Sequence, residues 1–378
     1  MHLKPLITTA FLATTSLAIT DRTGDVLNGA QVINSLDLND VPSSAVTRYY
    51  LRAGELNGGF PLHLPIFIAR GPKETLETGK KLSVSGTVHG DELNPIRVVQ
   101  KVFENLEINI DKLNGTVIGV PGINPMGIYL NQRNFWTASD SGFLTNINRV
   151  FPGTNSSSGG NGGNVIAYNL WNYIWGNTSN VDVAIDLHTP SSGSGSSLWC
   201  YADFRLPYVE RLAKLLQPNI LKIDPGEPGS IETTFVRHGV PAITVEMGIA
   251  KTWLPDLIDR TYDFVIRVMD DLSMLSGNSS TQHEPDLSKT FIGNTFQGVR
   301  STYGGFIESL VTWDQDVKAG QELGRIRNVW GDVIQILRAP VDARIHQAPI
   351  DPSVEPGQDV FSLVYNSTDP SCIDGCVL

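Results

Sequence analysis

The chain has 378 residues, 41% of them hydrophobic and 18% charged, and its formal net charge is −11. This length exceeds one typical domain and allows a large hydrophobic core. A strongly acidic chain repels nucleic acid and anionic membrane surfaces, and the sequence contains no long basic run. We therefore expect a globular protein with neither a nucleic-acid nor a membrane partner.

The first 18 residues have the features of a secretory signal peptide. Lys4 supplies one positive charge, residues 5–17 are mostly apolar, and Ser16 and Ala18 are small, as a signal peptidase requires near its cleavage site. The apolar stretch is too short for a membrane-spanning helix. A disordered cytosolic terminus is the alternative, because several threonines interrupt the stretch. We expect a signal peptide at 1–18 and a secreted, extracellular protein.

Glycosylation triplets and cysteines agree with export. Five Asn-X-Ser/Thr sequons begin at Asn114, Asn155, Asn177, Asn278 and Asn366. Each alone is weak support, but together they predict a glycoprotein. Cys372 and Cys376 are placed to close a small loop in the C-terminal tail, and Cys200 lies in an apolar strand pattern typical of a buried free thiol. Three cysteines are too few for a disulfide scaffold.

Strand patterns begin after a polar stretch. Residues 19–43 are polar and are expected to form an arm, and strands are predicted at 47–52 and 62–69. The next strand-like run, 81–88, is followed by a helical pattern in which apolar residues recur at the spacing of one helix face. Pro95 suits the first turn of that helix, where its missing N–H costs nothing.

The junction between that strand and that helix reads His-Gly-Asp-Glu, from His89 to Glu92. Two side chains three residues apart at such a junction can converge on one point. An imidazole and a carboxylate placed there supply two of the three protein ligands of an open catalytic zinc site. On its own this spacing is more often a surface or capping arrangement, so the prediction depends on a third ligand.

A second strand provides a candidate third ligand. Residues 181–188 form an apolar strand pattern that ends on His188, although a lone histidine at a strand end is usually structural. Asp186 shares a strand face with His188, because side chains alternate with period two, and is a candidate to fix the tautomer of the imidazole. A third apolar pattern, 241–246, ends on Glu246. Ligands and catalytic groups gather at such strand ends in open α/β folds.

Helical patterns at 206–216 and 253–275 alternate with these strands. The alternation predicts an α/β fold, in which a mixed or largely parallel sheet carries helices on both faces. Two loops rich in glycine, serine and asparagine, 153–164 and 191–197, are candidates to line or cover a cleft. Simple surface loops are an equally good interpretation of their composition.

The C-terminal quarter has a different character. Residues 278–285 have the composition of a linker, and short strand patterns with glycine and aspartate turns follow without a long helix, which predicts a small all-β domain. Its sequence segments resemble those of lipoyl and biotinyl carrier domains, which have a barrel-sandwich fold. The hairpin 339–343 has no lysine to modify, so we expect this domain to form a cleft wall or an oligomer contact. Tyr303 is a candidate for a side chain of this domain that lies in the cleft.

The chain is thus divided into four parts: a signal peptide at 1–18, an α/β domain at 19–284, a β domain at 285–366 and a tail at 367–378.

Five short motifs occur together: HGDE at 89–92, NPMG at 124–127, NINRVFPG at 146–153, DLH at 186–188 and VEMG at 245–248. With these motifs in this order, the chain resembles the succinylglutamate desuccinylase/aspartoacylase family, whose members are related to the zinc carboxypeptidases. The resemblance covers roughly residues 81–248 and implies a zinc carboxypeptidase-like mixed sheet flanked by helices. One departure is Asn146, where the family usually has an aspartate.

The resemblance implies a role for each matching residue. It implies one Zn²⁺ per chain with three ligands: His89, Glu92 and His188. Glu246 would be the general base and acid, and Arg133 would stabilise the developing oxyanion. Asn148 and Arg149 would bind a carboxylate of a small-molecule substrate, a task that suits the planar, always charged guanidinium.

These inferences predict a secreted zinc-dependent hydrolase that cleaves the amide bond of a small N-acylated amino acid with metal-activated water. A secreted zinc metallocarboxypeptidase acting on peptide C-termini is the alternative. The C-terminal β domain favours the deacylase, because peptidases of this kind usually leave that side of the cleft open. A non-catalytic binding protein is the third hypothesis. It predicts loss of Glu246 or of a ligand, and all of these residues are present.

Overall fold

The computed structural model describes residues 19–137, 144–275 and 284–376. The predicted signal peptide at 1–18 and most of the predicted linker, including the sequon at Asn278, lie outside these ranges. None of the helices in the described ranges combines the length and hydropathy needed to cross a membrane.

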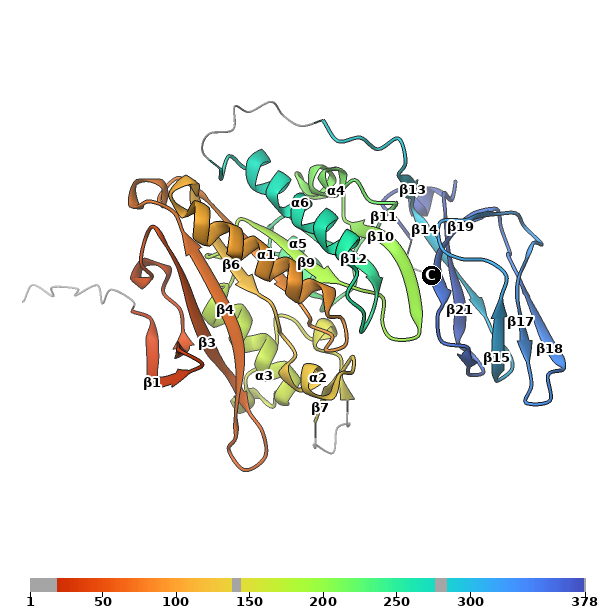
Figure 1. Ribbon diagram of the computed structural model, residues 1–378, viewed down its shortest axis with the longest axis horizontal. Coiled ribbons are helices and arrows are strands. Elements are labelled where there is room, and N and C mark those ends of the chain that lie inside the picture. Colours follow the sequence, from red (N-terminus) through yellow and green to blue (C-terminus); the bar gives the residue numbers. More distant parts are fainter. Residues whose placement is uncertain (1–18, 138–143, 276–283, 377–378) are drawn as a thin grey trace, which may run out of the picture.

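A long mixed sheet runs through the molecule (Figure 1). Its α/β part contributes these strands: β1 (Asp21–Leu27), β2 (Ala30–Ser35), β3 (Ala45–Glu55), β4 (Pro61–Arg70), β5 (Lys80–Gly86), β6 (Gly115–Val120), β9 (Val183–His188), β10 (Ser194–Ala202), β11 (Ile220–Ile223) and β12 (Ala242–Ile249). The central strands lie in the order β6-β5-β9-β12 and are parallel to one another. Antiparallel neighbours, β4 and β10, flank them.

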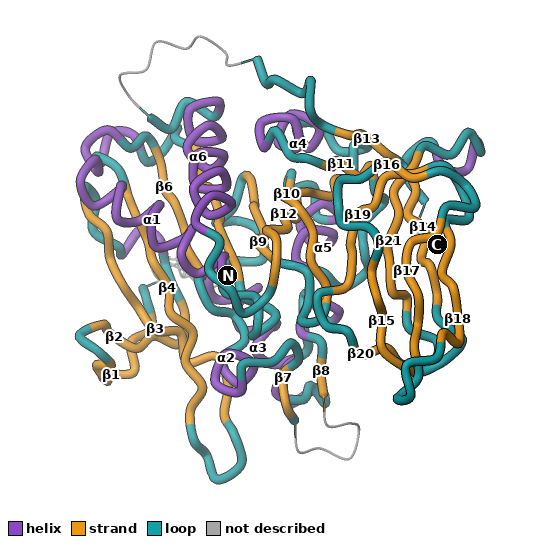
Figure 2. Tube along the Cα trace, turned by 45° about the vertical axis from the view of Figure 1, so that its right-hand side comes forward, coloured by secondary structure: helices purple, strands orange, loops and turns teal. Residues whose placement is uncertain are grey.

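Helices cover both faces of this sheet (Figure 2). Their bounds are α1 (Asn94–Asn109), α2 (Pro125–Leu130), α3 (Gly162–Asn169), α4 (Val209–Leu216), α5 (Ile231–Arg237) and α6 (Pro255–Asp271). Val117 packs in the core under α1, α4 and α6, whereas the next residue, Ile118, packs in the core under α3 and α5. Neighbouring side chains of a strand point to opposite faces, so the two cores lie on opposite sides. The predicted α/β architecture is confirmed.

The prediction of an N-terminal arm was wrong. The stretch 19–43 contains β1 and β2, and β2 pairs in parallel with β3. Val32 and Ile33 of β2 are buried, while most of β1 is exposed. An edge strand is held by backbone hydrogen bonds to one neighbour and keeps polar side chains in water. Its composition therefore looks like that of an unstructured segment.

The C-terminal region is all-β, as predicted. Four of its strands, β15 (Gly305–Ser309), β17 (Glu322–Arg327), β18 (Val333–Arg338) and β20 (Ser353–Val354), form a separate sheet. Five others extend the long sheet: β13 (Phe291–Gly293), β14 (Thr295–Arg300), β16 (Asp316–Val317), β19 (Ala343–Pro349) and β21 (Asp359–Tyr365). The two sheets enclose a hydrophobic core that includes Leu323, Ile345 and Phe361.

The β region is joined directly to the α/β part. Strand β19 pairs with the start of β10, where Ser194 lies opposite Pro349 and Gly195 opposite Ala348. The loop predicted at 191–197 is therefore partly strand. A small hairpin, β7 (Phe135–Trp136) and β8 (Leu144–Thr145), lies outside the long sheet. Cys372 and Cys376 form a disulfide and Cys200 is a buried free thiol, which confirms both cysteine predictions.

Candidate metal centre and active site

The loop between β5 and α1 holds the His-Gly-Asp-Glu motif in place. Gly90 packs so tightly that an added Cβ would lie 1.9 Å from the backbone carbon of Gly127. Asp91 accepts a hydrogen bond of 2.6 Å from the Ser192 hydroxyl. Because Ser192 follows β9, this bond ties the motif to the strand that carries His188. The loop is therefore fixed at both its glycine and its aspartate.

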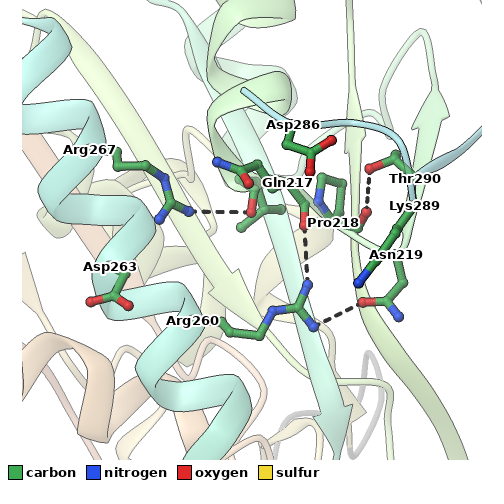
Figure 3. Close-up of a pocket in the computed structure, with 10 residues that line it drawn as sticks. Gln217, Pro218, Asn219, Arg260, Asp263, Arg267, Asp286, Lys289 and Thr290 are labelled. Carbon is green, nitrogen blue, oxygen red and sulfur yellow. Dashed lines mark hydrogen bonds between the residues drawn. The ribbon is translucent and has the colours of Figure 1, made fainter. Parts of the chain in front are cut away.

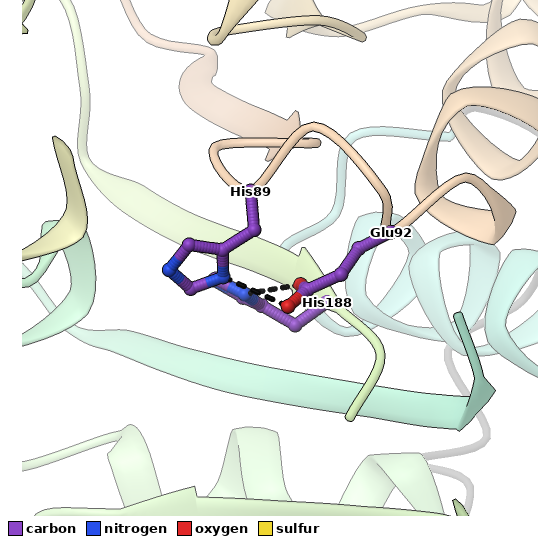
Figure 4. Close-up of side chains that lie close together, drawn as sticks. All are labelled: His89, Glu92 and His188. Atoms are coloured by element: carbon purple, nitrogen blue, oxygen red, sulfur yellow. Dashed lines mark hydrogen bonds and ion pairs between the residues drawn. The ribbon is translucent and has the colours of Figure 1, made fainter. Parts of the chain in front are cut away.

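Three of the predicted site residues converge (Figure 4). The Nδ1 atoms of His89 and His188 each lie 2.9 Å from an oxygen of Glu92, one on Oε1 and the other on Oε2. One ligand atom from each residue lies within 4.8 Å of the others, and all three residues are buried. Within the described ranges this is the one group of three or more such side chains close enough to hold a metal ion.

Both imidazoles are oriented by oxygens on their far side. Asp186 Oδ2 lies 2.7 Å from His188 Nε2, and Asn146 Oδ1 lies 3.1 Å from His89 Nε2. Asn146 Oδ1 also accepts the Asn148 backbone N–H at 3.0 Å, which fixes the direction of its amide. Each Nε2 can thus donate its proton to an oxygen, which leaves each Nδ1 lone pair facing Glu92.

The donor set fits a divalent metal. Two imidazole nitrogens and one carboxylate are one of the protein ligand sets of catalytic zinc, at about 2.0–2.2 Å from the ion. In the structure these donors already face one point. Burial opposes the charge of Glu92, but the two histidines outweigh burial and hold the pKa of Glu92 well below its usual range. Glu92 therefore keeps the negative charge that a cation needs.

Glu246 lies beside the ligands because of the sheet register. It pairs with His188 across the parallel strands β12 and β9, and with Trp199 across the antiparallel strands β12 and β10. Its Oε2 is buried and has no hydrogen-bond partner. Burial raises the pKa of Glu246 to about 8, with Glu92 adding to the effect and His188 opposing it. Two nearby carboxyls with such different pKa values suit separate roles.

Arg133 reaches the ligands from the loop after α2. Its Nη1 lies 3.0 Å from Glu92 Oε1 and 3.1 Å from His89 Nδ1, and it also hydrogen-bonds Ser191 Oγ. The side chain of Asn124 holds this loop by donating to the Arg133 carbonyl at 3.2 Å. The predicted oxyanion role of Arg133 stays a prediction. Its position brings a positive charge to the ligand group.

Asn148 and Arg149 lie in a short 3₁₀ helix, η4 (Ile147–Arg149). Asn148 Oδ1 accepts the backbone N–H of Ile231 at 2.9 Å, and its Nδ2 lies 3.5 Å from His188 Nε2. The guanidinium of Arg149 donates to the Asn148 carbonyl at 2.8 Å and lies 3.4 Å from Glu227. Both residues line the same cavity as the ligand histidines, and their predicted substrate role stays a prediction.

A cavity of about 360 Å³ opens onto these groups. The sequence predicted part of its lining: His89, Arg133, Asn148, Arg149, His188 and Glu246. Other lining residues were missed: Trp199 and Tyr201 come from β10 of the α/β part, and four come from the C-terminal β region, namely Phe296, His346, Gln347 and Ser362. Tyr303, which the sequence suggested, is 54% exposed and is not part of the lining. The prediction of Tyr303 was wrong because the strands that face the cavity are β14, β19 and β21.

A second cavity, of about 460 Å³, lies between α4 and α6 (Figure 3). Its two arginines are occupied by the polypeptide. Arg260 donates to the Gln217 carbonyl at 3.1 Å, and Arg267 donates to the Leu215 carbonyl at 2.9 Å. These bonds satisfy carbonyls at the C-terminal end of α4, which lack partners within the helix. We therefore assign these arginines a structural role.

His346 makes the stability of the protein sensitive to acid. Burial, and secondarily Lys222, lowers its pKa to about 3, whereas an unfolded histidine has a pKa of about 6.5. Between these values the unfolded chain binds a proton that the folded chain does not, so stability falls as pH drops below about 6.5. Urea unfolding at pH 7.5 and pH 5 should show a larger loss for the wild type than for His346→Phe. Equal losses would contradict this assignment.

The comparisons with known proteins agree with this geometry. A family model described as the succinylglutamate desuccinylase/aspartoacylase catalytic domain matches residues 78–272. A search of curated proteins found no match.

Solved structures share the fold at low sequence identity. A succinylglutamate desuccinylase/aspartoacylase from Rhodobacter sphaeroides is 19% identical, with a TM-score of 0.69 over 85% of this chain and 96% of that one. The product-bound ectoine utilization protein EutE (DoeB) from Ruegeria pomeroyi is 17% identical, with a TM-score of 0.70 over 85% and 95%. An aspartoacylase family protein from Mesorhizobium loti is 21% identical, with a TM-score of 0.67 over 87% and 96%.

The family model spans more than half of the chain. The structural neighbours match more of this chain than its α/β region alone, since they cover 85–87% of it. This chain belongs to the succinylglutamate desuccinylase/aspartoacylase family, whose members are hydrolases of amide bonds.

Proposed function

We propose that this protein is a zinc-dependent deacylase that hydrolyses the amide bond of a small N-acylated amino acid. The observation that carries the proposal is the convergence of His89, Glu92 and His188 on one point, with Glu246 on the neighbouring strand. These three residues would hold a zinc ion, which would supply a Lewis acid that activates water and polarises a carbonyl. The other residues of the cavity account for the movement of protons and the binding of substrate.

Glu246 is suited to carry the proton. Its Oε2 has no partner, and burial raises its pKa to about 8 without a metal ion, a value that the charge of a bound cation would lower towards neutral pH. A carboxyl with such a pKa can accept a proton from the attacking water and then give it to the departing amine. Glu92 cannot take this part, because its pKa lies far below neutrality and its oxygens face the two histidines.

Two arginines line the cavity and supply positive charge to an anionic substrate. Arg133, beside the ligands, is placed to stabilise negative charge that develops on the carbonyl oxygen, an effect worth about 3 kcal/mol per donor. Arg149 and the amide Nδ2 of Asn148 are placed to bind the substrate carboxylate. A local pair of guanidiniums offsets the unfavourable net charge of −11.

The β region favours a deacylase over a carboxypeptidase. Phe296, His346 and Ser362 line the same cavity as the ligand histidines. They therefore limit how far a substrate can extend beyond Glu246. A peptide needs an open path there for the rest of its chain, whereas a short acyl group does not.

Glu246→Gln tests the catalytic proposal. The amide has nearly the same shape but cannot accept the proton, so kcat should fall about 10²–10⁴-fold. The assay measures free amine released from a panel of N-acetyl amino acids and short peptides. The wild type should act on the N-acetyl amino acids and leave the peptides intact.

Glu210→Gln is a matched control, because Glu210 is exposed on α4, pairs with Lys214 and lies outside the cavity lining. It should retain most of the activity. Two results would count against the proposal: a Glu246→Gln variant with wild-type kcat, or release of C-terminal residues from peptides by the wild type.

We also propose that the mature protein is secreted and glycosylated. The disulfide between Cys372 and Cys376 and the surface exposure of Asn177 and Asn366 support this proposal. Oxidising compartments favour such disulfides. In its native host, the protein should accumulate in the medium, begin near residue 19 and lose mass on treatment with an N-glycosidase. An intact N-terminus on an intracellular, unglycosylated chain would refute the proposal.

A further inference from the structure

Two buried polar atoms in the cavity wall have no partner in the protein. Trp199 Nε1 and His346 Nε2 are both buried and both lack a hydrogen bond. The two residues are 4% and 2% exposed, and both line the cavity that holds the ligand histidines. A buried polar group without a partner costs about 1–3 kcal/mol. Such a pair in one wall indicates that a ligand supplies the missing partner.

The wall lies on the side of Glu246 away from His89, Glu92 and His188, which we call the ligand trio. The cross-strand row runs from His188 through Glu246 to Trp199. The His346 ring lies edge-on to Trp199, with ring centroids 4.1 Å apart, and stacks on Phe296 at 4.3 Å. Three aromatic rings therefore form one compact surface next to the catalytic carboxyl.

This wall carries no positive charge. The cations among the cavity-lining residues are Arg133 and Arg149, and both lie near the ligand trio. Lys222 lies behind the wall, with its ammonium 5.1 Å from the centroid of the Phe296 ring, but it is not among the lining residues and is held by Asp224 and by the Cys376 carbonyl. His346 stays uncharged at neutral pH, because burial lowers its pKa to about 3. A carboxylate placed against this wall would be desolvated without a cation to pair with, because Lys222 already pairs with Asp224 and does not line the cavity.

We propose that Trp199 and His346 select the acyl group of the substrate, and that this group is uncharged and carries a hydrogen-bonding atom. The inference rests on the proposed deacylase function, in which Asn148 and Arg149 take the amino-acid carboxylate beside His188. The acyl group then extends past Glu246 to the aromatic wall. An acyl chain that ends in an amide can hydrogen-bond with both the Trp199 N–H and the His346 nitrogen. An acyl chain that ends in a carboxylate would bring a negative charge to this wall without a cation to pair with it.

Two acyl groups of nearly equal shape test the proposal. The amino acid used in this test is the one that the wild type releases fastest from its N-acetyl derivative. Two substrates are made from it, the N-succinyl and the N-succinamoyl derivative. The succinyl group ends in a carboxylate, whereas the succinamoyl group ends in an amide. The wild type should cleave the succinamoyl derivative with a kcat/KM at least about tenfold above that of the succinyl derivative, since one buried hydrogen bond or charge mismatch changes binding by that factor.

Trp199→Phe removes the N–H and keeps an aromatic ring. It should lower kcat/KM for the succinamoyl substrate about fivefold more than for the N-acetyl substrate, which does not reach the N–H. Trp253→Phe is the matched control, because Trp253 is 54% exposed and lies outside the cavity lining. It should leave the ratio of the two substrates unchanged.

The outcomes separate this inference from the proposed function. Cleavage of N-acetyl amino acids with a preference for succinyl over succinamoyl overturns the inference and leaves the deacylase in place. Equal losses on both substrates in Trp199→Phe also overturn it. If Trp199→Phe fails to fold, the wild-type ratio of succinamoyl to succinyl decides the matter. Turnover of no N-acyl amino acid at all refutes the proposed function itself.

Discussion

Glu246 lies beside His188 because β12 pairs with β9 in a fixed parallel register. A slip of one residue would turn Glu246 to the opposite face of the sheet, away from the ligands. The register is held by the two cores, which bury Ile185 and Val245 under α1, α4 and α6, and Ala184 and Ala242 on the other side. The geometry of the site is thus a consequence of how the sheet buries its apolar residues on both faces.

The surroundings of this part of the sheet give chemically similar side chains different pKa values and different hydrogen-bond partners. Glu92 faces two imidazoles and stays ionised, while Glu246 has a buried oxygen without a partner and a raised pKa. His188 is oriented by a carboxylate, Asp186, whereas His89 is oriented by an amide, Asn146. His188 and His89 therefore differ in basicity, since a charged partner raises it more than a neutral one. Asn146, which stands where the family usually has an aspartate, keeps the hydrogen bond to His89 but lacks the negative charge.

Local patterns predicted the parts of the site that depend on local structure. The strand runs before His89, His188 and Glu246 are apolar in sequence, and each ends near an ionisable group. The strand β2 was missed because its neighbour β3 decides its conformation more than its own composition does. Trp199 and His346 were missed because they are separated by nearly 150 residues, and their meeting depends on the pairing of β10 with β19. Pairings over such distances leave no signal in a single sequence.

Binding of a metal ion by His89, Glu92 and His188 can be measured as the metal content of the purified protein, by mass spectrometry of the wild type, His89→Ala and His63→Ala. His63, in β4, lies outside the trio and serves as the matched control. We expect about one zinc per chain in the wild type and in His63→Ala, and a loss of most of it in His89→Ala. A wild type that binds no metal after incubation with zinc, or a His89→Ala variant that retains it fully, would show that these three residues do not form a zinc site.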